Sequence, residues 1–168
     1  MLKKRWLLLL IFTVCFSVAI FGQVPQGSSV VHNIHKINST ILGEERTVLV
    51  RVPANYVGRD EKFPVVYMLD AHAPQNSMMV GIVEQQSWGG MMPEMIVVGI
   101  QNTNRTRDLT PTKSQRMDGS GGGDKFLDFR EKEVVTMVEK NYRTQPFRVF
   151  AGHSLGGLMA VYAFVSRP

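Results

Sequence analysis

Three continuous apolar runs constrain the fold of this 168-residue chain more than any other feature of its sequence. They cover residues 64–69, 95–100 and 147–151. Runs in which apolar side chains do not alternate with polar ones are typical of strands buried on both faces of a parallel sheet. The sequence therefore predicts a sheet whose central strands are parallel.

The segments around these runs predict helices and an antiparallel edge. Residues 77–86 and 126–142 carry apolar side chains at helical spacing, whereas residues 30–37 and 46–52 alternate like strands that face water on one side. Strands alternating with helices indicate an α/β fold with antiparallel edge strands, followed by parallel strands with helices on both faces. The side chains expected together on one side of the first helix are Met78, Met79, Ile82 and Val83.

The third apolar run leads into Gly152-His153-Ser154-Leu155-Gly156, which fits the pattern G-x-S-x-G, and residues 158–165 behind it predict a helix. In α/β-hydrolases the nucleophilic serine sits on such a sharp strand-to-helix turn, where glycines leave room for the chain to pass close to itself. The pattern predicts that Ser154 is a catalytic nucleophile in a strained backbone geometry. It also predicts that the backbone N–H of Leu155 faces the developing oxyanion. The alternative is a glycine-rich turn with an incidental serine.

With these residues the chain resembles the esterase family of α/β-hydrolases, which includes enterochelin (siderophore), feruloyl and acetylxylan esterases, S-formylglutathione hydrolases and mycolyltransferases. The resemblance implies an α/β-hydrolase fold and a serine carboxylic ester hydrolase that works through an acyl-enzyme. It implies no cofactor, and as substrate a small-molecule or polysaccharide-linked ester such as a siderophore, feruloyl or acetyl ester. The segments that carry it lie within residues 39–168 and are 46–53, 64–70, 96–100, 104–111, 126–127, 142–143 and 152–157.

Two stretches of the resemblance bear on the site. Residues 105–111 read R-T-R-D-x-T-P and look most like the siderophore-esterase-like branch. The family's Leu-Asp-Gly is Leu69-Asp70-Ala71 here, and the amide that lends the family its second oxyanion contact maps to the backbone of His72.

The polar stretch 101–124 follows a core strand, on the side where ligands bind in open α/β sheets. Arg105, Arg107 and Asp108 lie in it and are candidate substrate-binding residues, since two arginines can hold an anionic or catecholate group. The alternative is that arginine and aspartate pair with each other and pin the loop. The sequence leaves both readings open, and no His, Cys, Asp or Glu cluster has metal-ligand spacing.

The partners that a nucleophilic serine needs are missing from the expected place. In α/β-hydrolases an acid and then a histidine follow the nucleophile, yet none of the residues after Ser154 is Asp, Glu or His. We therefore expect the chain to be the N-terminal portion of a longer esterase, truncated after the turn and inactive alone. The alternatives are a natural short form, a non-catalytic carbohydrate- or ligand-binding member of the fold, and a fragment of a prolyl-oligopeptidase-like peptidase. The four histidines are His32, His35, His72 and His153.

The first 22 residues predict a signal peptide, with residues 23–168 as the esterase domain. A short basic stretch precedes an apolar run over 6–20, shorter than a spanning helix prefers, and small residues follow. We expect a periplasmic or secreted protein without stable membrane association, the alternative being an uncleaved anchor. Without this segment, 16 basic and 14 acidic side chains remain, so the charge does not indicate nucleic-acid binding. The single cysteine, Cys15, lies in the same segment.

Overall fold

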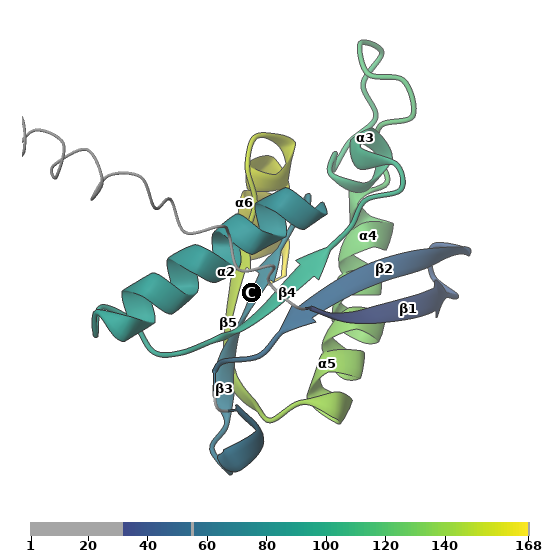
Figure 1. Cartoon of the computed structure of the whole chain (residues 1–168). Helices are drawn as coiled ribbons and strands as arrows, with labels where there is room; N and C mark the ends of the chain where they lie inside the picture. Colours follow the sequence, from purple (N-terminus) through teal and green to yellow (C-terminus); the bar gives the residue numbers. More distant parts are fainter. Residues whose placement is uncertain (1–31, 55, 168) are drawn as a thin grey trace, which may run out of the picture. The chain divides into compact units, whose positions relative to one another are not determined.

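The computed structural model describes residues 32–54 and 56–167, which form one five-stranded sheet with helices against it (Figure 1). The strand order is β1-β2-β4-β3-β5. β2 is antiparallel to both β1 and β4, whereas β3 is parallel to both β4 and β5. The predicted antiparallel edge and parallel centre are confirmed. The strands are β1 (Asn33–Ser39), β2 (Glu44–Arg51), β3 (Phe63–Met68), β4 (Ile96–Ile100) and β5 (Thr144–Ala151).

Helices cover both faces of the sheet, as the sequence predicts. In Figure 1, α2 crosses one face, and the continuous stretch from α4 to α5 runs along the other. One π-helical segment, η2, interrupts that stretch without ending it. The helices are α2 (Ala73–Trp88), α3 (Arg105–Asp108), α4 (Gly123–Phe129), η2 (Arg130–Val135), α5 (Thr136–Asn141) and α6 (Leu155–Ser166), with a short 3-10 turn, η1 (Tyr56–Gly58).

The core lies around the three central strands, β2, β4 and β3. Side chains that alternate along these strands, such as Val50, Tyr67 and Val98, pack with Phe126 and Phe129 of α4. The strand positions between them, on the face towards α2, are buried as well. Burial on both faces explains why these strands read as continuous apolar runs.

Two expectations about burial are wrong. β5 is an edge strand of the described sheet, and Phe147 is 62% and Val149 36% exposed, because only β3 pairs with it. On α2, Met78 and Ile82 face solvent, being 67% and 52% exposed. Of the four expected side chains Val83 is buried, and the buried stripe of α2 joins it to Val80 and Asn76, which are spaced one helical turn apart.

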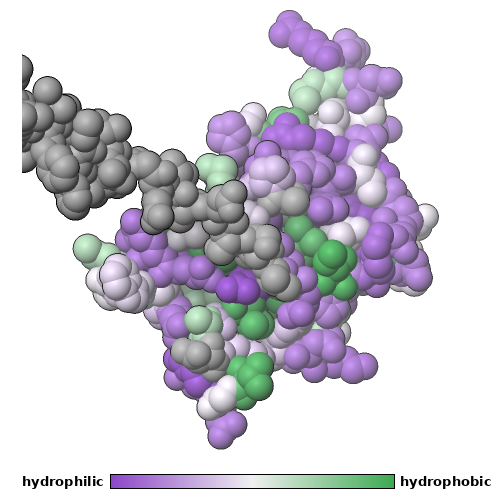
Figure 2. Space-filling model, viewed as in Figure 1, coloured by the Kyte–Doolittle hydropathy of each residue, from purple (hydrophilic) through white to green (hydrophobic). Residues whose placement is uncertain are grey.

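The surface seen from the α2 side is largely hydrophilic, with hydrophobic side chains in small separate groups (Figure 2). Among the described residues, no helix combines the length and the apolar character needed to cross a bilayer. The signal-peptide prediction for residues 1–22 lies outside the described residues.

Candidate active site

The turn between β5 and α6 has the strained geometry that the sequence predicts. Ser154 stands immediately before the first residue of α6, with φ 56° and ψ −117°. A positive φ is uncommon for a residue with a side chain and costs about 1–3 kcal/mol unless surrounding contacts impose it. Ser154 is exposed, so its hydroxyl is accessible from solvent. The serine thus projects from a sharp strand-to-helix turn at the carboxyl end of a parallel strand.

Glycine makes this turn sterically feasible. A Cβ on Gly152 would lie 2.4 Å from the backbone carbon and oxygen of Gly156, closer than real Cβ contacts come. A Cβ on Gly156 would meet Asp70 Oδ2 at 3.2 Å, a tight contact that a small shift relieves. The Gly156 backbone therefore leaves no room for a side chain at Gly152, whereas a Cβ at Gly156 needs the Asp70 carboxylate to move by a few tenths of an ångström.

The start of α6 places the Leu155 amide, the predicted oxyanion donor, directly after Ser154. Leu155 is the first residue of α6, and the first amides of a helix have no acceptor within the helix. The neighbouring amide of Gly156 bonds to the His153 carbonyl at 2.9 Å and closes the turn. The aligned peptide dipoles of α6 also favour negative charge at this end.

A second left-handed turn lies beside the first, at the end of β3. Asp70 has φ 57°, and its carboxylate accepts hydrogen bonds from Asn102 and Arg105. The His72 amide donates to the Asp70 carbonyl at 2.8 Å. An oxyanion bound by the His72 N–H would compete with this internal acceptor. The role predicted for His72 therefore requires a change at this turn that the Leu155 amide does not need.

A hollow of about 490 Å³ opens between these two turns. Its wall combines methionine side chains with polar groups from the ends of β3 and β5 and the start of α2. A hollow of about 510 Å³ lies elsewhere on the molecule, around Arg51 and Trp88. The Arg51 guanidinium there pairs with Glu84 at 3.1 Å. The first reaches the two residues before Ser154, and it is lined by Met68, Leu69, Asp70, His72, Gln75, Met79, Arg105, Ala151, Gly152 and His153.

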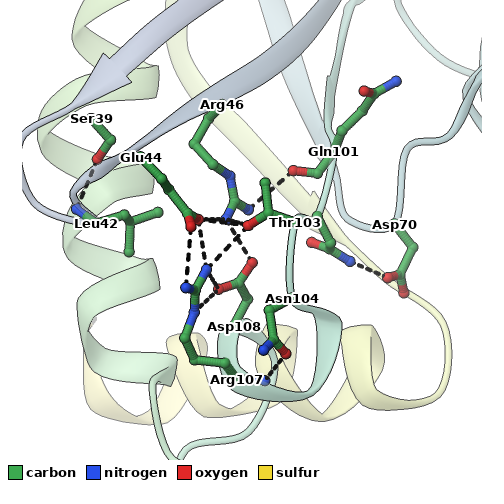
Figure 3. A network of polar contacts seen from close by, with 11 residues as sticks. Ser39, Leu42, Glu44, Arg46, Asp70, Gln101, Thr103, Asn104, Arg107 and Asp108 are labelled. Atoms are coloured by element: carbon green, nitrogen blue, oxygen red, sulfur yellow. Dashed lines mark hydrogen bonds and ion pairs between the residues drawn. The ribbon is translucent and has the colours of Figure 1, made fainter. Parts of the chain in front are cut away.

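Figure 3 shows where the structure places Arg107 and Asp108. Arg46 Nη1 donates to Asp108 Oδ2 at 2.7 Å, and Arg107 Nη2 donates to Glu44 Oε1 at 2.6 Å and to Asp108 Oδ1 at 2.8 Å. The hydroxyl of Thr103 bonds to the same Glu44 oxygen at 2.6 Å. We call these five residues the Arg46 cluster. It ties the loop after β4 to the beginning of β2.

Burial and pairing dominate the electrostatics of the Arg46 cluster. The Arg46 side chain is fully buried, and its guanidinium carbon lies 5.6 Å and 5.4 Å from the ring centres of Phe126 and Phe129. Hydrogen bonds, above all from Arg107, lower the pKa of Glu44 to about 2, and the bond to Glu44 raises the pKa of Arg107. These contacts agree with the loop-pinning reading of Arg107 and Asp108.

Sequence comparison then assigns the chain to a family. The family described as "Putative esterase" matches residues 39–168. The chain belongs to this esterase family.

The similar proteins include characterised esterases. A ferri-bacillibactin esterase of Bacillus subtilis is 29% identical over 126 residues, which are 63% of this chain and 44% of the relative. A siderophore triacetylfusarinine C esterase of Aspergillus fumigatus is 39% identical over 66 residues, 38% of this chain and 23% of the relative.

An IroE-like serine hydrolase from Shewanella oneidensis shares the fold. Its crystal structure is 36% identical, with a TM-score of 0.77 over 82% of this chain and 48% of the hydrolase. The chain spans about half the length of the curated relatives that it matches. Its sheet and helices are thus part of an α/β-hydrolase fold.

The histidines of the esterase chain do not reach the serine. His35 Nε2 lies 2.6 Å from the Tyr142 hydroxyl, and His32 Nδ1 lies 3.2 Å from Asn76 Nδ2. Within residues 32–54 and 56–167, no hydrogen bond joins a histidine to the Ser154 hydroxyl. The described residues also contain no group of three His, Cys, Asp or Glu side chains placed to hold a metal ion.

Sequence reasoning missed two polar partners. The first is Arg46, which is fully buried. Its burial could have been predicted, because Arg46 lies two residues before Val48 and four before Val50 on β2 and therefore shares their inward face. The second is the bond of Arg105 to Asp70. The sequence gives no such signal for it, because the bond joins the loop after β4 to the turn after β3, which are far apart along the chain.

Proposed function

We propose that Ser154 is the nucleophile of a serine esterase that cleaves a carboxylic ester through an acyl-enzyme. The observation that carries the proposal is the left-handed Ser154 between a parallel strand and the first turn of α6. In this position the hydroxyl is exposed and the Leu155 amide is next to it, so attack and charge stabilisation occur on the same side of the turn. The hollow between Asp70 and His153 then receives the acyl or alcohol part.

The mechanism needs a base. A serine hydroxyl is a weak nucleophile at neutral pH until a histidine takes its proton. Since no described histidine bonds to Ser154, the proposal places the histidine and its orienting acid after Ser154 in chain order, outside the described residues. The histidine gives the serine proton to the departing alcohol, which leaves the acyl group on Ser154. It then takes a proton from an attacking water and returns it to the serine oxygen as the carboxylic acid departs.

We further propose that the substrate is a small-molecule ester of the siderophore type. Two relatives, a ferri-bacillibactin esterase and a siderophore triacetylfusarinine C esterase, support this class. The lining of the hollow also suits it, because Met68 and Met79 offer apolar contact to an acyl or aromatic group while Gln75 offers hydrogen bonds.

The proposed chemistry is tested by comparing two forms of the protein with p-nitrophenyl acetate and a trilactone siderophore. The 168-residue chain should hydrolyse either ester several powers of ten more slowly than a product of the gene that extends beyond Pro168, as expected for an enzyme without its triad histidine. In the extended product Ser154→Ala should abolish turnover. Ser87→Ala is the matched control, because the Ser87 hydroxyl bonds to the Pro93 carbonyl away from the site.

Two results contradict the proposed chemistry. Full turnover by Ser154→Ala means that another group is the nucleophile. An extended product that binds esters without cleaving them supports a non-catalytic binding member of the fold instead.

We also propose that the protein is exported and that residues 23–168 form the mature esterase domain in the periplasm or outside the cell. The support is the basic and apolar pattern of the first 22 residues. Mass spectrometry of the protein from a secreting host should find an N-terminus near Gln23. Finding residues 1–22 still attached to a membrane-bound protein would contradict export with removal of the signal peptide.

A further inference from the structure

The two left-handed turns of the site are neighbours in the sheet. Asp70 and Ser154 are the non-glycine residues with positive φ in the described part of the chain. They follow β3 and β5, which run parallel, with Met68 beside Ala151 and the Leu69 amide bonded to the Ala151 carbonyl at 2.9 Å. Two conformations that cost free energy therefore lie side by side, and surrounding contacts must impose both of them.

Arg105 contacts both turns. Its Nε donates to Asp70 Oδ1 at 2.8 Å and its Nη2 to Asp70 Oδ2 at 2.9 Å, a two-pronged grip on the carboxylate. The same Nη2 lies 3.3 Å from the carbonyl oxygen of His153, the residue before Ser154. Asn102, just past the end of β4, donates to the same carboxylate. We call Arg105, Asp70, Asn102 and the His153 carbonyl the Arg105 cluster.

The His153 carbonyl connects this cluster to the oxyanion donor. It also accepts the Gly156 amide at 2.9 Å, the bond that closes the turn into α6. The peptide that carries this carbonyl ends at the nitrogen of Ser154. Its orientation therefore sets the φ of Ser154 and, through it, the directions of the Ser154 hydroxyl and the Leu155 amide.

We propose that Arg105 is a positioning residue of the candidate active site, which holds the peptide before Ser154 in register with the Asp70 turn. This inference rests on the proposed function of Ser154. The Asp70 turn leads to His72, and the peptide before Ser154 leads to Leu155. One guanidinium therefore connects the two backbone segments that carry the predicted oxyanion donors, the amides of His72 and Leu155. Arg105 acts through these segments.

The chemistry of the contact explains why this residue is arginine. A guanidinium is planar and presents several N–H groups in a rigid fork, which matches a carboxylate with two bonds and leaves a direction for a third acceptor. A lysine ammonium is a point charge on a flexible stem and cannot hold both carboxylate oxygens and a carbonyl in one geometry. The hydrogen bond to Asp70 also raises the pKa of Arg105.

The experiment compares Arg105→Gln and Arg105→Lys with wild type in the full 168-residue chain. Amide hydrogen exchange followed by NMR reports the turn directly, because the Gly156 amide bonds to the carbonyl that Arg105 contacts. Arg105→Gln should speed Gly156 exchange by about tenfold or more, and Arg105→Lys should restore only part of the protection. Exchange in β4 should stay at the wild-type rate. Arg148→Gln is the control for the loss of an exposed arginine. Arg148 lies on β5, the strand that leads to the turn, and pairs with Glu139 of α5.

A tetrahedral probe reads the function of the same geometry. Phenylboronic acid adds to a serine oxygen while the hydroxyl proton passes to water, and one boronate oxygen then occupies the oxyanion position. Boron NMR should detect an adduct with wild type and none with Ser154→Ala. Its affinity should fall about tenfold or more in Arg105→Gln and stay near wild type in Arg148→Gln.

Each outcome decides the matter. Unchanged Gly156 exchange in Arg105→Gln overturns the positioning role, and so does faster exchange spread equally over β4 and the turn, which means that Arg105 only stabilises the fold. Equal boronate affinity of Arg105→Gln and wild type also overturns it. If wild type forms no adduct, the exchange measurement decides the positioning role by itself, and the proposed function of Ser154 is decided separately by the turnover of the extended product.

Discussion

The Arg46 cluster and the Arg105 cluster join the same loop to the sheet in opposite ways. Both place an arginine against a carboxylate, and both involve residues of the R-T-R-D stretch. In the Arg46 cluster the arginine and Asp108 are 0% and 1% exposed, whereas Arg105 and Asp70 are 41% and 19% exposed. Similar chemistry thus occurs once in the core and once at the rim of the candidate site.

The difference in burial indicates that Arg46 contributes to stability and that Arg105 contributes to function. A buried ion has lost its water, so its partners must compensate a large desolvation cost, and removing one of them leaves an unbalanced charge. An exposed pair exchanges its contacts for water at little cost. The Arg46 cluster should therefore decide whether the loop folds, and the Arg105 cluster how the turn at Ser154 is oriented.

The largest expected effect is that of Asp108→Ala. The change leaves the buried Arg46 guanidinium without its closest carboxylate, and we expect the free energy of unfolding to fall by about 3–5 kcal/mol. Urea unfolding of the full chain measures it. Glu45→Ala is the control, since Glu45 pairs with Lys36 and both side chains are more than half exposed. Equal losses for the two variants would contradict the contrast between buried and exposed pairs.

A smaller loss is expected for Arg107→Ala. Arg107 bonds to both Glu44 and Asp108 but is 33% exposed, so water replaces part of what is removed. We expect a loss of about 1–2 kcal/mol in the same assay. Phenylboronate affinity should stay near that of wild type, in contrast to Arg105→Gln. A drop in affinity as large as that of Arg105→Gln would place Arg107 in the candidate site and revive its predicted substrate-binding role.

Acid should loosen the Arg46 cluster as Glu44 takes up a proton. The folded pKa of Glu44 is about 2, below its ordinary value of 4.5. A carboxylate with a lowered folded pKa contributes stability that is complete above the unfolded pKa and is lost as the pH falls towards the folded one. The stability of wild type should therefore decline between about pH 4.5 and pH 2, and Glu44→Gln should remove part of this decline. An identical pH dependence of the two proteins would show that folding does not lower the pKa of Glu44.

The smallest effect on stability is expected for Arg105→Ala. Because the Arg105–Asp70 pair is partly exposed, we expect a change of no more than about 1 kcal/mol in urea unfolding. A loss as large as that of Asp108→Ala would remove the distinction between the two clusters. Arg105 would then be a structural residue, like Arg46.

The parts of the molecule that the sequence predicts well are those fixed by local pattern. The continuous apolar runs of β3 and β4 predict central strands, because such strands are buried on both faces. The glycine spacing around Ser154 predicts the left-handed turn, since a side chain at Gly152 would collide with the Gly156 backbone. Both predictions are confirmed.

Predictions that depend on distant neighbours were less successful. β5 reads like a central strand, but its burial depends on what pairs with its outer edge, and in the described sheet β3 is its neighbour on one side alone. The buried face of α2 was only partly predicted, because Met78 and Ile82 fit a helical stripe with Val83 as well as Val80 does. The grip of Arg105 on Asp70 and His153 required the three-dimensional order of the strands. The catalytic roles of Ser154, Leu155 and His72 stay predictions.

The outer side of β5 has a consequence for how this chain behaves in solution. Phe147 on β5 and Phe164 and Val165 on α6 are well exposed, and the peptide groups along the outer edge of β5 have no strand beside them in the described sheet. An edge of this kind is a template for another extended segment, and apolar side chains next to it add to the gain from covering it. Any molecule that binds there binds the folded chain and leaves the unfolded chain unaffected. By mass action, the folded fraction of this chain then depends on how much of it, or of a binder, is present.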